Sequence, residues 1–258
     1  MASVYKYYYP SQYSRKALND GYFWFSKARN LNDPFDICAE IINLYPHFKN
    51  FLITKYGDIK SFYTKAHKYA ICCFTTDCLN KHMWALYADS YKGWCLEFDD
   101  EHIIDGSKTG VPPKWYEVQY VDKYPNFNNP NLALPIETCS GSHILNNFFK
   151  DDPHNEERFF TYLLSLKEKS IWETEAERRI FLGDVFYMVN PSIDKSAIGY
   201  SIPWNTGKLM SIIMGSNVSE ENRHFLHKMA QKWKVELKQV LPIVPSVDFK
   251  LTIHDIKA

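Results

Sequence analysis

Aromatic residues are the feature of this sequence that most constrains its fold. The chain of 258 residues contains 17 Phe, 18 Tyr and 7 Trp, and many of them occur in short apolar segments separated by polar ones. Large aromatic side chains stabilise a fold when they are buried, and disordered chains typically contain few of them. The aromatic residues therefore predict a folded protein with a sizeable core.

The apolar segments alternate between strand-like and helix-like patterns. Segments rich in β-branched and aromatic residues predict strands, and no repeat or linker interrupts the chain. The sequence therefore predicts an α+β fold in a single domain, 1–258, with a mainly antiparallel, aromatic-rich sheet flanked by helices. The predicted strands cover 3–9, 22–26, 70–75, 94–99, 114–121, 180–189, 209–215, 235–244 and 247–253.

Helices are predicted where apolar residues recur at helical spacing next to capping residues. Ser219, which two glutamates follow, is expected to cap a long helix, and Asp152 is expected to begin another. Apolar spacing around 40–69 predicts a helical insertion, whereas the Asn- and Pro-rich stretch around 122–150 is expected to be rich in loops. Further helices are predicted over 13–20 and 81–90.

Charge and cysteine content restrict the function classes. The chain has 30 Lys and Arg against 30 Asp and Glu. A protein that binds nucleic acid mainly through its phosphates needs a basic excess, so a general nucleic-acid-binding protein is not expected. No apolar run approaches the length of a membrane span, and the first residues lack a signal-peptide pattern. The six cysteines form no C-x-x-C pair, which is typical of reduced thiols. We therefore expect a cytoplasmic protein with no membrane partner.

Three glutamates alternate along the segment WETEAERR: Glu173, Glu175 and Glu177. If residues 173–181 are extended, the three side chains share one face, where crowding and burial would shift their pKa values apart and separate acid from base roles. The alternative is a solvated strand edge on which the glutamates pair with nearby cations. Those cations are Lys167, Lys169, Arg178 and Arg179.

The first two predicted strands carry a second candidate group. Lys6 lies within a run of tyrosines, and a lysine beside a tyrosine can hold a phosphate or a ribose while the ring stacks on a base or a nicotinamide. The alternative is an edge-strand lysine that opposes aggregation. Ser26, at the end of the second strand, is either a ligand contact or only a strand-terminal hydroxyl or a cap for the next turn.

Metal-dependent chemistry has little support in the sequence. His224 and His227 are three residues apart on a predicted helix, but no third ligand of suitable type follows nearby. Asp33, Asp36 and Asp89 could serve a nuclease, yet their spacing matches no metal site. We therefore expect no metal ion.

The order of several blocks resembles the bacterial domain-of-unknown-function family 2971. The blocks are VYKYY, YFWFS with LNDPFD, CCFT, MWALYADSYKGWCLEFD, and K-x-x-W-x-x-E-x-E-x-R from Lys169 to Arg179. The resemblance extends from residue 4 to about residue 215, and it implies a bacterial, cytoplasmic protein. Tyr91 stands where relatives often have a His before Lys-Gly, which weakens any role for that position.

A second resemblance is to ADP-ribosyltransferase-like enzymes, including the DNA-modifying toxin branch. Those enzymes place a basic residue or His on the first strand, a Ser, Thr or Tyr on the second, and a Glu, often as E-x-E, on a late strand. Lys6, Ser26 and the pair Glu175 and Glu177 occur in that order here, with Lys6 in place of the usual Arg or His. The resemblance implies an ADP-ribosyltransferase-like fold and NAD as the substrate.

The same resemblance implies a role for each residue. Glu177 would stabilise the oxocarbenium ion that forms as the nicotinamide–ribose bond breaks, and Glu175 would orient or deprotonate the acceptor. Lys6 would hold a phosphate or the ribose, and Ser26 would support the ribose or the glutamate. The residues expected to enclose the nicotinamide ring are Tyr7, Tyr22 or Trp24.

Two functions are consistent with these observations. The first is an NAD-dependent ADP-ribosyltransferase-like effector, a toxin or phage-defence protein that modifies a nucleic acid or a protein. The alternative is a non-enzymatic sensor or binding module of a bacterial defence system, with an aromatic ligand pocket. In that case the glutamates would be structural partners of Arg178 and Arg179.

Overall fold

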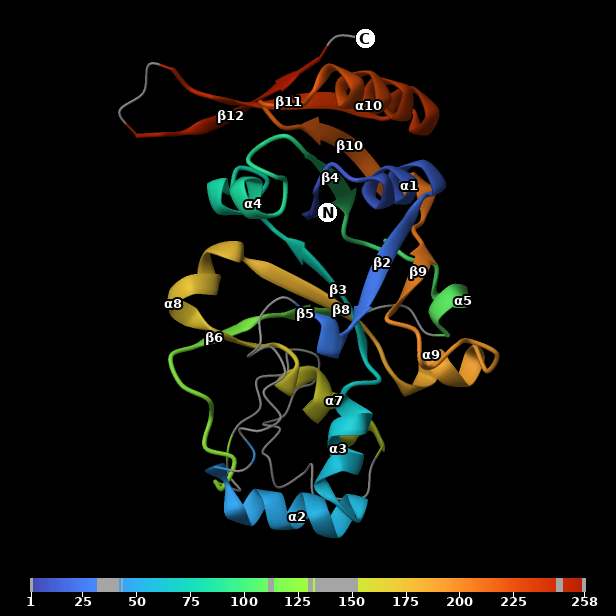
Figure 1. Cartoon of the computed structure of the whole chain (residues 1–258), viewed down its shortest axis with the longest axis vertical. Coiled ribbons are helices and arrows are strands. Elements are labelled where there is room, and N and C mark those ends of the chain that lie inside the picture. Colours follow the sequence, from blue (N-terminus) through green and yellow to red (C-terminus); the bar gives the residue numbers. More distant parts are fainter. Residues whose placement is uncertain are drawn as a thin grey trace.

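A ten-stranded sheet runs through the computed structural model, which describes residues 2–31, 42, 44–110, 114–129, 132, 153–244 and 248–256 (Figure 1). The strands of this sheet are β1 (Ser3–Tyr8), β2 (Tyr22–Lys27), β3 (Ala70–Thr75), β4 (Trp94–Asp99), β5 (Trp115–Glu117), β8 (Glu177–Leu182), β9 (Gly199–Pro203), β10 (Leu209–Met214), β11 (Glu236–Pro242) and β12 (Leu251–Asp255). Two further strands, β6 (Gln119–Val121) and β7 (Leu166–Glu168), pair with each other.

The strand order is β12-β11-β10-β4-β1-β3-β2-β9, and β8 pairs with β3 and β5. Within this sheet β10 and β11 are parallel, and every other neighbouring pair is antiparallel. The predicted α+β fold with a mainly antiparallel sheet is therefore confirmed.

The helices lie on the faces and at the ends of the sheet (Figure 1). They are α1 (Gln12–Asp20), α2 (Pro46–Tyr56), α3 (Ile59–Ala66), α4 (Lys81–Leu86), α5 (Gly106–Thr109), α7 (Pro153–Leu163), α8 (Lys169–Trp172), α9 (Asp184–Val189) and α10 (Glu220–Trp233). Short 3-10 turns are η1 (Ala28–Asn30), η3 (Glu173–Glu175) and η4 (Thr206–Lys208). None of the described helices has both the length and the hydrophobicity that a bilayer crossing requires.

Several predicted helix signals are confirmed. The Ser219 hydroxyl accepts a hydrogen bond from the Asn222 amide at the start of α10, and Gly21 ends α1 in the left-handed conformation. The predicted helical insertion contains α2 and α3, which are separated at Gly57. Residues 122–129 form neither helix nor strand, as expected, but the rest of the loop prediction, the Asp152 cap and the NDPFD block lie outside the described residues.

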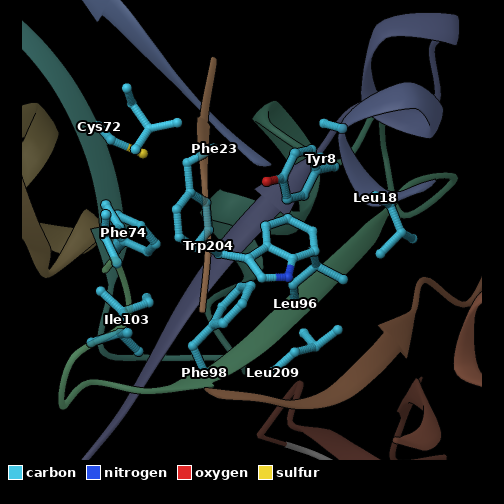
Figure 2. Close-up of a cluster of buried hydrophobic side chains, with 14 of the residues drawn as sticks. Tyr8, Leu18, Phe23, Cys72, Phe74, Leu96, Phe98, Ile103, Trp204 and Leu209 are labelled. Atoms are coloured by element: carbon cyan, nitrogen blue, oxygen red, sulfur yellow. The ribbon is translucent and has the colours of Figure 1, made fainter. Parts of the chain in front are cut away.

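Aromatic rings fill the central core, which we define as the buried cluster around Phe23 of β2 (Figure 2). The Phe23 ring centroid lies 5.1 Å from that of Phe74, 4.9 Å from that of Phe98 and 5.3 Å from that of Trp204. These separations suit edge-to-face and tilted ring packing, which adds stabilisation beyond the burial of area. Aromatic side chains from β2, β3 and β4 thus pack against one another in the central core.

Two other clusters complete the interior. A second cluster unites α2, α3 and α7 with one end of the sheet, around Phe62 and Phe159. A third cluster lies on the sheet face opposite the central core and contains Tyr7, Trp84, Ala88, Cys95, Ile213 and Val240. Side chains alternate between the two faces of each strand, so Tyr7 joins the third cluster while its neighbour Tyr8 joins the central core.

Some predicted strands are wrong in extent or type. The predicted strand 180–189 stops at Leu182, and after Gly183 the chain forms α9, because a short apolar run has no period that distinguishes strand from helix. The predicted strand 114–121 divides at Val118 into β5 and β6, which pair with different strands. The predicted helix 81–90 ends at Leu86, and β9 was not predicted.

Two glycines allow the turn after α4 to lie against the sheet. A Cβ at Gly215 would lie 1.9 Å from the carbonyl oxygen of Tyr91, and one at Gly93 would lie 2.0 Å from that of Tyr8. The turn itself places Asp89 and two further residues in the left-handed region, which costs about 1–2 kcal/mol per residue. Close backbone approach therefore holds a strained segment in place.

We predict that Gly215→Ala destabilises the fold, because a backbone oxygen cannot move aside as a flexible side chain can. The free energy of unfolding should fall by more than about 2 kcal/mol, measured by urea titration. Gly207→Ala is the control, since a Cβ there would meet only the Asn205 amide oxygen at 3.8 Å, and it should change stability by less than about 0.5 kcal/mol. Equal effects of the two substitutions would contradict the prediction.

Candidate functional site

A cavity of about 140 Å³ lies where β1 and β3 diverge. The two strands pair at a single position, Tyr5 with Thr75, so the sheet is split on either side of it. Both strands line the cavity. The other lining residues include Met83 of α4, Tyr87 just after it, Lys167 of β7, Glu175 of η3 and Glu177 of β8. We call this cavity the β1–β3 pocket.

Four charged side chains form a buried ion-pair network at this pocket. The Lys167 ammonium lies 2.6 Å from Glu175 Oε2 and 3.1 Å from Glu177 Oε2. The Arg179 guanidinium donates from Nε to Glu177 Oε1 at 2.8 Å and from Nη2 to Glu177 Oε2 at 3.0 Å. Each of the four side chains is at most 5% exposed, so the two carboxylates and two cations neutralise each other away from water.

The backbone brings Glu175 and Glu177 together by a turn. Residues Glu173–Glu175 form η3, Ala176 is left-handed at φ 46°, and β8 begins at Glu177. The extended conformation considered for 173–181 is therefore wrong for 173–176 and correct from Glu177 onward. The Glu173 side chain is exposed and pairs with Lys169 at 3.8 Å. The alternative of a solvated strand edge is also wrong for Glu175 and Glu177, because both side chains are buried. The ion-pair partners that this alternative named, Lys167 and Arg179, are the ones found in the structure.

Neighbouring polar groups fix the network further. The Tyr87 hydroxyl donates to Glu175 Oε1 at 2.6 Å, and the Glu177 amide donates to the Tyr120 hydroxyl at 2.8 Å. The Trp172 ring centroid lies 4.3 Å from the Lys167 ammonium. Strands, helices and an aromatic ring therefore all restrain the positions of the two carboxylates.

The electrostatics of the pocket leave Glu177 ionised at neutral pH. Burial alone would raise its pKa, but the adjacent Arg179 and Lys167 charges outweigh burial and lower the pKa to about 2. Burial raises the pKa of the Cys73 thiol and of the Tyr5 and Tyr7 phenols, so these groups stay neutral. The pocket thus offers the ionised Glu177 carboxylate beside neutral aromatic walls.

Lys6 joins the two strands across the split. Its ammonium donates to the Cys73 carbonyl at 2.9 Å and lies 5.1 Å from the Phe74 ring centroid. Because β1 lies between β4 and β3 in the sheet, the alternative of an edge-strand lysine is wrong. Lys6 lines the pocket together with Tyr7, Glu175 and Glu177, so four of the seven predicted site residues lie together.

The three predicted residues on β2 lie elsewhere, because β3 separates β2 from β1. Tyr22 packs against the central core, and Trp24 is 42% exposed beside Gly199. The Ser26 hydroxyl donates to the Lys27 carbonyl at 3.4 Å. None of the three is among the residues that line the pocket.

Other pocket residues were not recognised in the sequence. Tyr87 lies in the apolar segment MWALYA, which was interpreted only as part of a helix. Lys167 was considered only as an ion-pair partner of the glutamates on a solvated strand edge. No cluster of three or more His, Cys, Asp or Glu side chains suited to a metal ion occurs in the described part of the chain. Asp33 and Asp36 lie outside that part, and Asp89 pairs with Lys92 in the turn after α4.

Comparison of the chain with protein-family models, with curated proteins and with solved structures finds no match. The resemblances to family 2971 and to ADP-ribosyltransferase-like enzymes therefore stay predictions. The site has to be interpreted from its own geometry.

We predict that Lys167→Met strongly destabilises the protein, because it removes the ammonium that pairs with both the Glu175 and the Glu177 carboxylates. Breaking a buried ion pair in this way costs about 3–5 kcal/mol, which chemical denaturation would detect. Lys169→Met is the matched control, since its exposed pair with Glu173 contributes about 0–1 kcal/mol. A small effect of Lys167→Met, similar to that of the control, would mean that the network contributes little to stability.

We also predict a specific acid sensitivity. The pKa of Glu177 falls from an ordinary value of 4.5 to about 2 on folding, so the unfolded chain takes up this proton first. The stabilisation from Glu177 should be complete above about pH 4.5 and should disappear as the pH falls towards about 2. Urea titrations of wild type and Glu177→Gln should therefore show a stability difference that narrows over this interval, whereas a constant difference would contradict the assignment.

Proposed function

We propose that the chain is an ADP-ribosyltransferase-type enzyme with NAD as its substrate. One observation carries the proposal: Lys6 of β1 and the carboxylates of Glu175 and Glu177 line the same aromatic-walled pocket. A basic group for a phosphate or ribose, a fixed anion for a developing cation, and rings for a planar heterocycle are the groups that cleavage of a nicotinamide–ribose bond requires.

The size of the pocket limits which part of NAD enters it. Its volume of about 140 Å³ is well below the roughly 300–1,000 Å³ of pockets that enclose a whole drug-sized ligand. We therefore propose that only the nicotinamide end enters, beside Tyr7 and Phe74, while the rest of the dinucleotide lies outside the pocket. Lys6, whose ammonium donates to the Cys73 carbonyl at the edge of the pocket, is proposed to contact the part of the substrate next to the nicotinamide ring.

The proposed reaction transfers ADP-ribose from nicotinamide to an acceptor. The bond between C1′ of the ribose and the ring nitrogen breaks, its electron pair leaves with neutral nicotinamide, and positive charge develops on the ribose. The ionised Glu177 stabilises that charge. The acceptor then forms a bond to C1′ and gives its proton to Glu175, which returns it to solvent.

The acceptor is proposed to be a nucleic acid or a protein, and the reaction is placed in the cytoplasm, where NAD is available. The free thiols of all four described cysteines are consistent with a reducing compartment. The equal numbers of acidic and basic residues favour an acceptor that is held locally at the pocket, because a broad electrostatic surface would need a basic excess.

We predict that purified protein releases nicotinamide from NAD in the presence of mixed DNA, RNA and protein acceptors. Glu177→Gln keeps the shape of the side chain but removes its charge, so the release rate should fall by at least about 100-fold. Glu173→Gln is the control, because Glu173 is exposed and does not line the pocket, and it should react like wild type. Chromatography of released nicotinamide provides the measurement, with circular dichroism to verify folding.

Failure of wild type to release nicotinamide from NAD with any acceptor would refute the enzymatic proposal. So would an undiminished rate in a folded Glu177→Gln variant.

A second candidate is a non-enzymatic module that binds a small ligand in the same pocket. This candidate is favoured because both carboxylate oxygens of Glu177 already accept hydrogen bonds from Arg179 and Lys167. These two cations neutralise the negative charge that an enzyme would need to stabilise a developing cation. Calorimetry with NAD and with nicotinamide distinguishes the candidates. Binding without turnover, retained in Glu177→Gln, would support the module.

A further inference from the structure

The β1–β3 pocket already holds a cation that belongs to the chain itself, the Lys167 ammonium. It lies 2.6 Å from Glu175 Oε2 and 3.1 Å from Glu177 Oε2. The centroid of the Trp172 ring lies 4.3 Å from the same ammonium. Carboxylates and the face of an indole ring are the groups that recognise an organic cation. Because Lys167 also lines the cavity, a ligand that enters the cavity meets this ammonium.

The charges of the network indicate whether a cationic ligand can bind beside Lys167 or has to replace it. Lys167 and Arg179 form ion pairs with Glu175 and Glu177, and each of the four side chains is at most 5% exposed. A cation that entered beside the intact network would lose its water and gain no unpaired negative charge. A cation that replaces the Lys167 ammonium keeps the balance of charges as it is.

Of the two cationic side chains, Lys167 is the one that is free to leave. Arg179 donates through two nitrogens to Glu177 and through Nη1 to the Leu164 carbonyl. Its strand, β8, pairs on both sides, with β3 and with β5. Lys167 instead lies on β7, which belongs to a separate two-stranded sheet with β6. Its ammonium is carried on a flexible four-carbon chain, and the adjacent Trp172 is only half-buried.

Both carboxyl groups keep a hydrogen-bond partner when Lys167 leaves. The Tyr87 hydroxyl donates to Glu175 Oε1 at 2.6 Å, and Arg179 continues to donate to Glu177. Neither group is therefore buried without a hydrogen bond, which is a large part of the cost of breaking a buried ion pair. The remaining cost is the missing positive charge, and an incoming cation restores that charge.

We propose that the pocket has a subsite for a planar organic cation, which Lys167 occupies only in the free protein. A pyridinium ring replaces the ammonium next to Glu175 and Glu177, and the lysine side chain turns towards solvent past Trp172. The inference rests on the proposed function in taking the pyridinium ring of NAD as the natural cation. The exchange separates Glu177 from the Lys167 ammonium, so the charge of Glu177 acts on the substrate.

A matched pair of small ligands tests the subsite. Nicotinamide methylated on its ring nitrogen is a pyridinium cation, whereas nicotinamide has the same ring and amide without the charge. In calorimetry, wild type should bind the methylated cation at least about 10-fold more tightly than nicotinamide. Glu175→Gln should reduce that preference, because it removes a carboxylate of the subsite. Glu173→Gln is the control and should keep the preference, because Glu173 is exposed and pairs with Lys169.

Acetylation of lysines tests the exchange itself. In the free protein, an N-hydroxysuccinimide ester of acetate should modify the buried Lys167 at least about 10-fold more slowly than the exposed Lys169. Saturation with the methylated cation should raise the rate at Lys167 by about the same factor and leave the rate at Lys169 unchanged, as measured by mass spectrometry. Nicotinamide should leave Lys167 protected. A ligand that only covered an intact network would lower the rate at Lys167 instead.

The Lys167→Met variant removes the competing ammonium. A folded variant should bind the methylated cation more tightly than wild type does, and the cation should restore part of the stability that the substitution removes. Thermal unfolding with and without the ligand provides the measurement. If the variant does not fold, the acetylation rates of wild type provide the test.

Three results would each overturn the inference: equal affinity for the two ligands, no binding of the methylated cation, or a Lys167 acetylation rate that does not rise when the cation binds. A folded Lys167→Met variant with unchanged affinity would also overturn it. The enzymatic proposal fails separately. Turnover of NAD while Lys167 stays protected would refute the exchange alone, whereas exposure of Lys167 without any turnover would refute the enzymatic proposal alone.

Discussion

The Lys167 ammonium, buried between the Glu175 and Glu177 carboxylates, is the interaction on which the site depends. Without it, two negative charges would lie close together in a region with little water, with Arg179 as the only cation of the network left for both. Its two partners lie in the turn η3 and at the start of β8. The Lys167 ammonium therefore holds the turn that leads into β8. The split between β1 and β3 persists beside it, bridged by Lys6.

The same ion pairs set the chemical character of the pocket. Arg179 and Lys167 keep Glu177 ionised, but they also neutralise much of the field that an ionised carboxylate would exert on a developing cation. Under the proposed function, the effect of Glu177 on the developing cation therefore depends on how much of that neutralisation persists when the substrate is bound. Tyrosines and Phe74 line the remaining wall, and under the proposed function these rings would contact a planar heterocycle.

Much of the fold was predictable because local chemistry marks the elements. The strands over 3–9, 70–75 and 94–99 were predicted from β-branched and aromatic residues, and the α10 cap from Ser219 and two glutamates. The prediction failed over 180–189, where only Gly183 and Asp184 separate the apolar residues at the end of β8 from those of α9. Part of the site was also predictable, since four of the seven predicted site residues, Lys6, Tyr7, Glu175 and Glu177, lie together.

The sequence by itself determined the fold class, the buried aromatic core and the candidate residues, because hydrophobic burial and backbone preference act over a few neighbouring residues. Only the tertiary structure decided which of those residues meet. β3 enters the sheet between β1 and β2, which separates Tyr22, Trp24 and Ser26 from Lys6, and a left-handed Ala176 turns Glu175 towards Lys167. The strand order and the turn at Ala176 depend on contacts between segments far apart in the chain. A local sequence pattern therefore does not predict them.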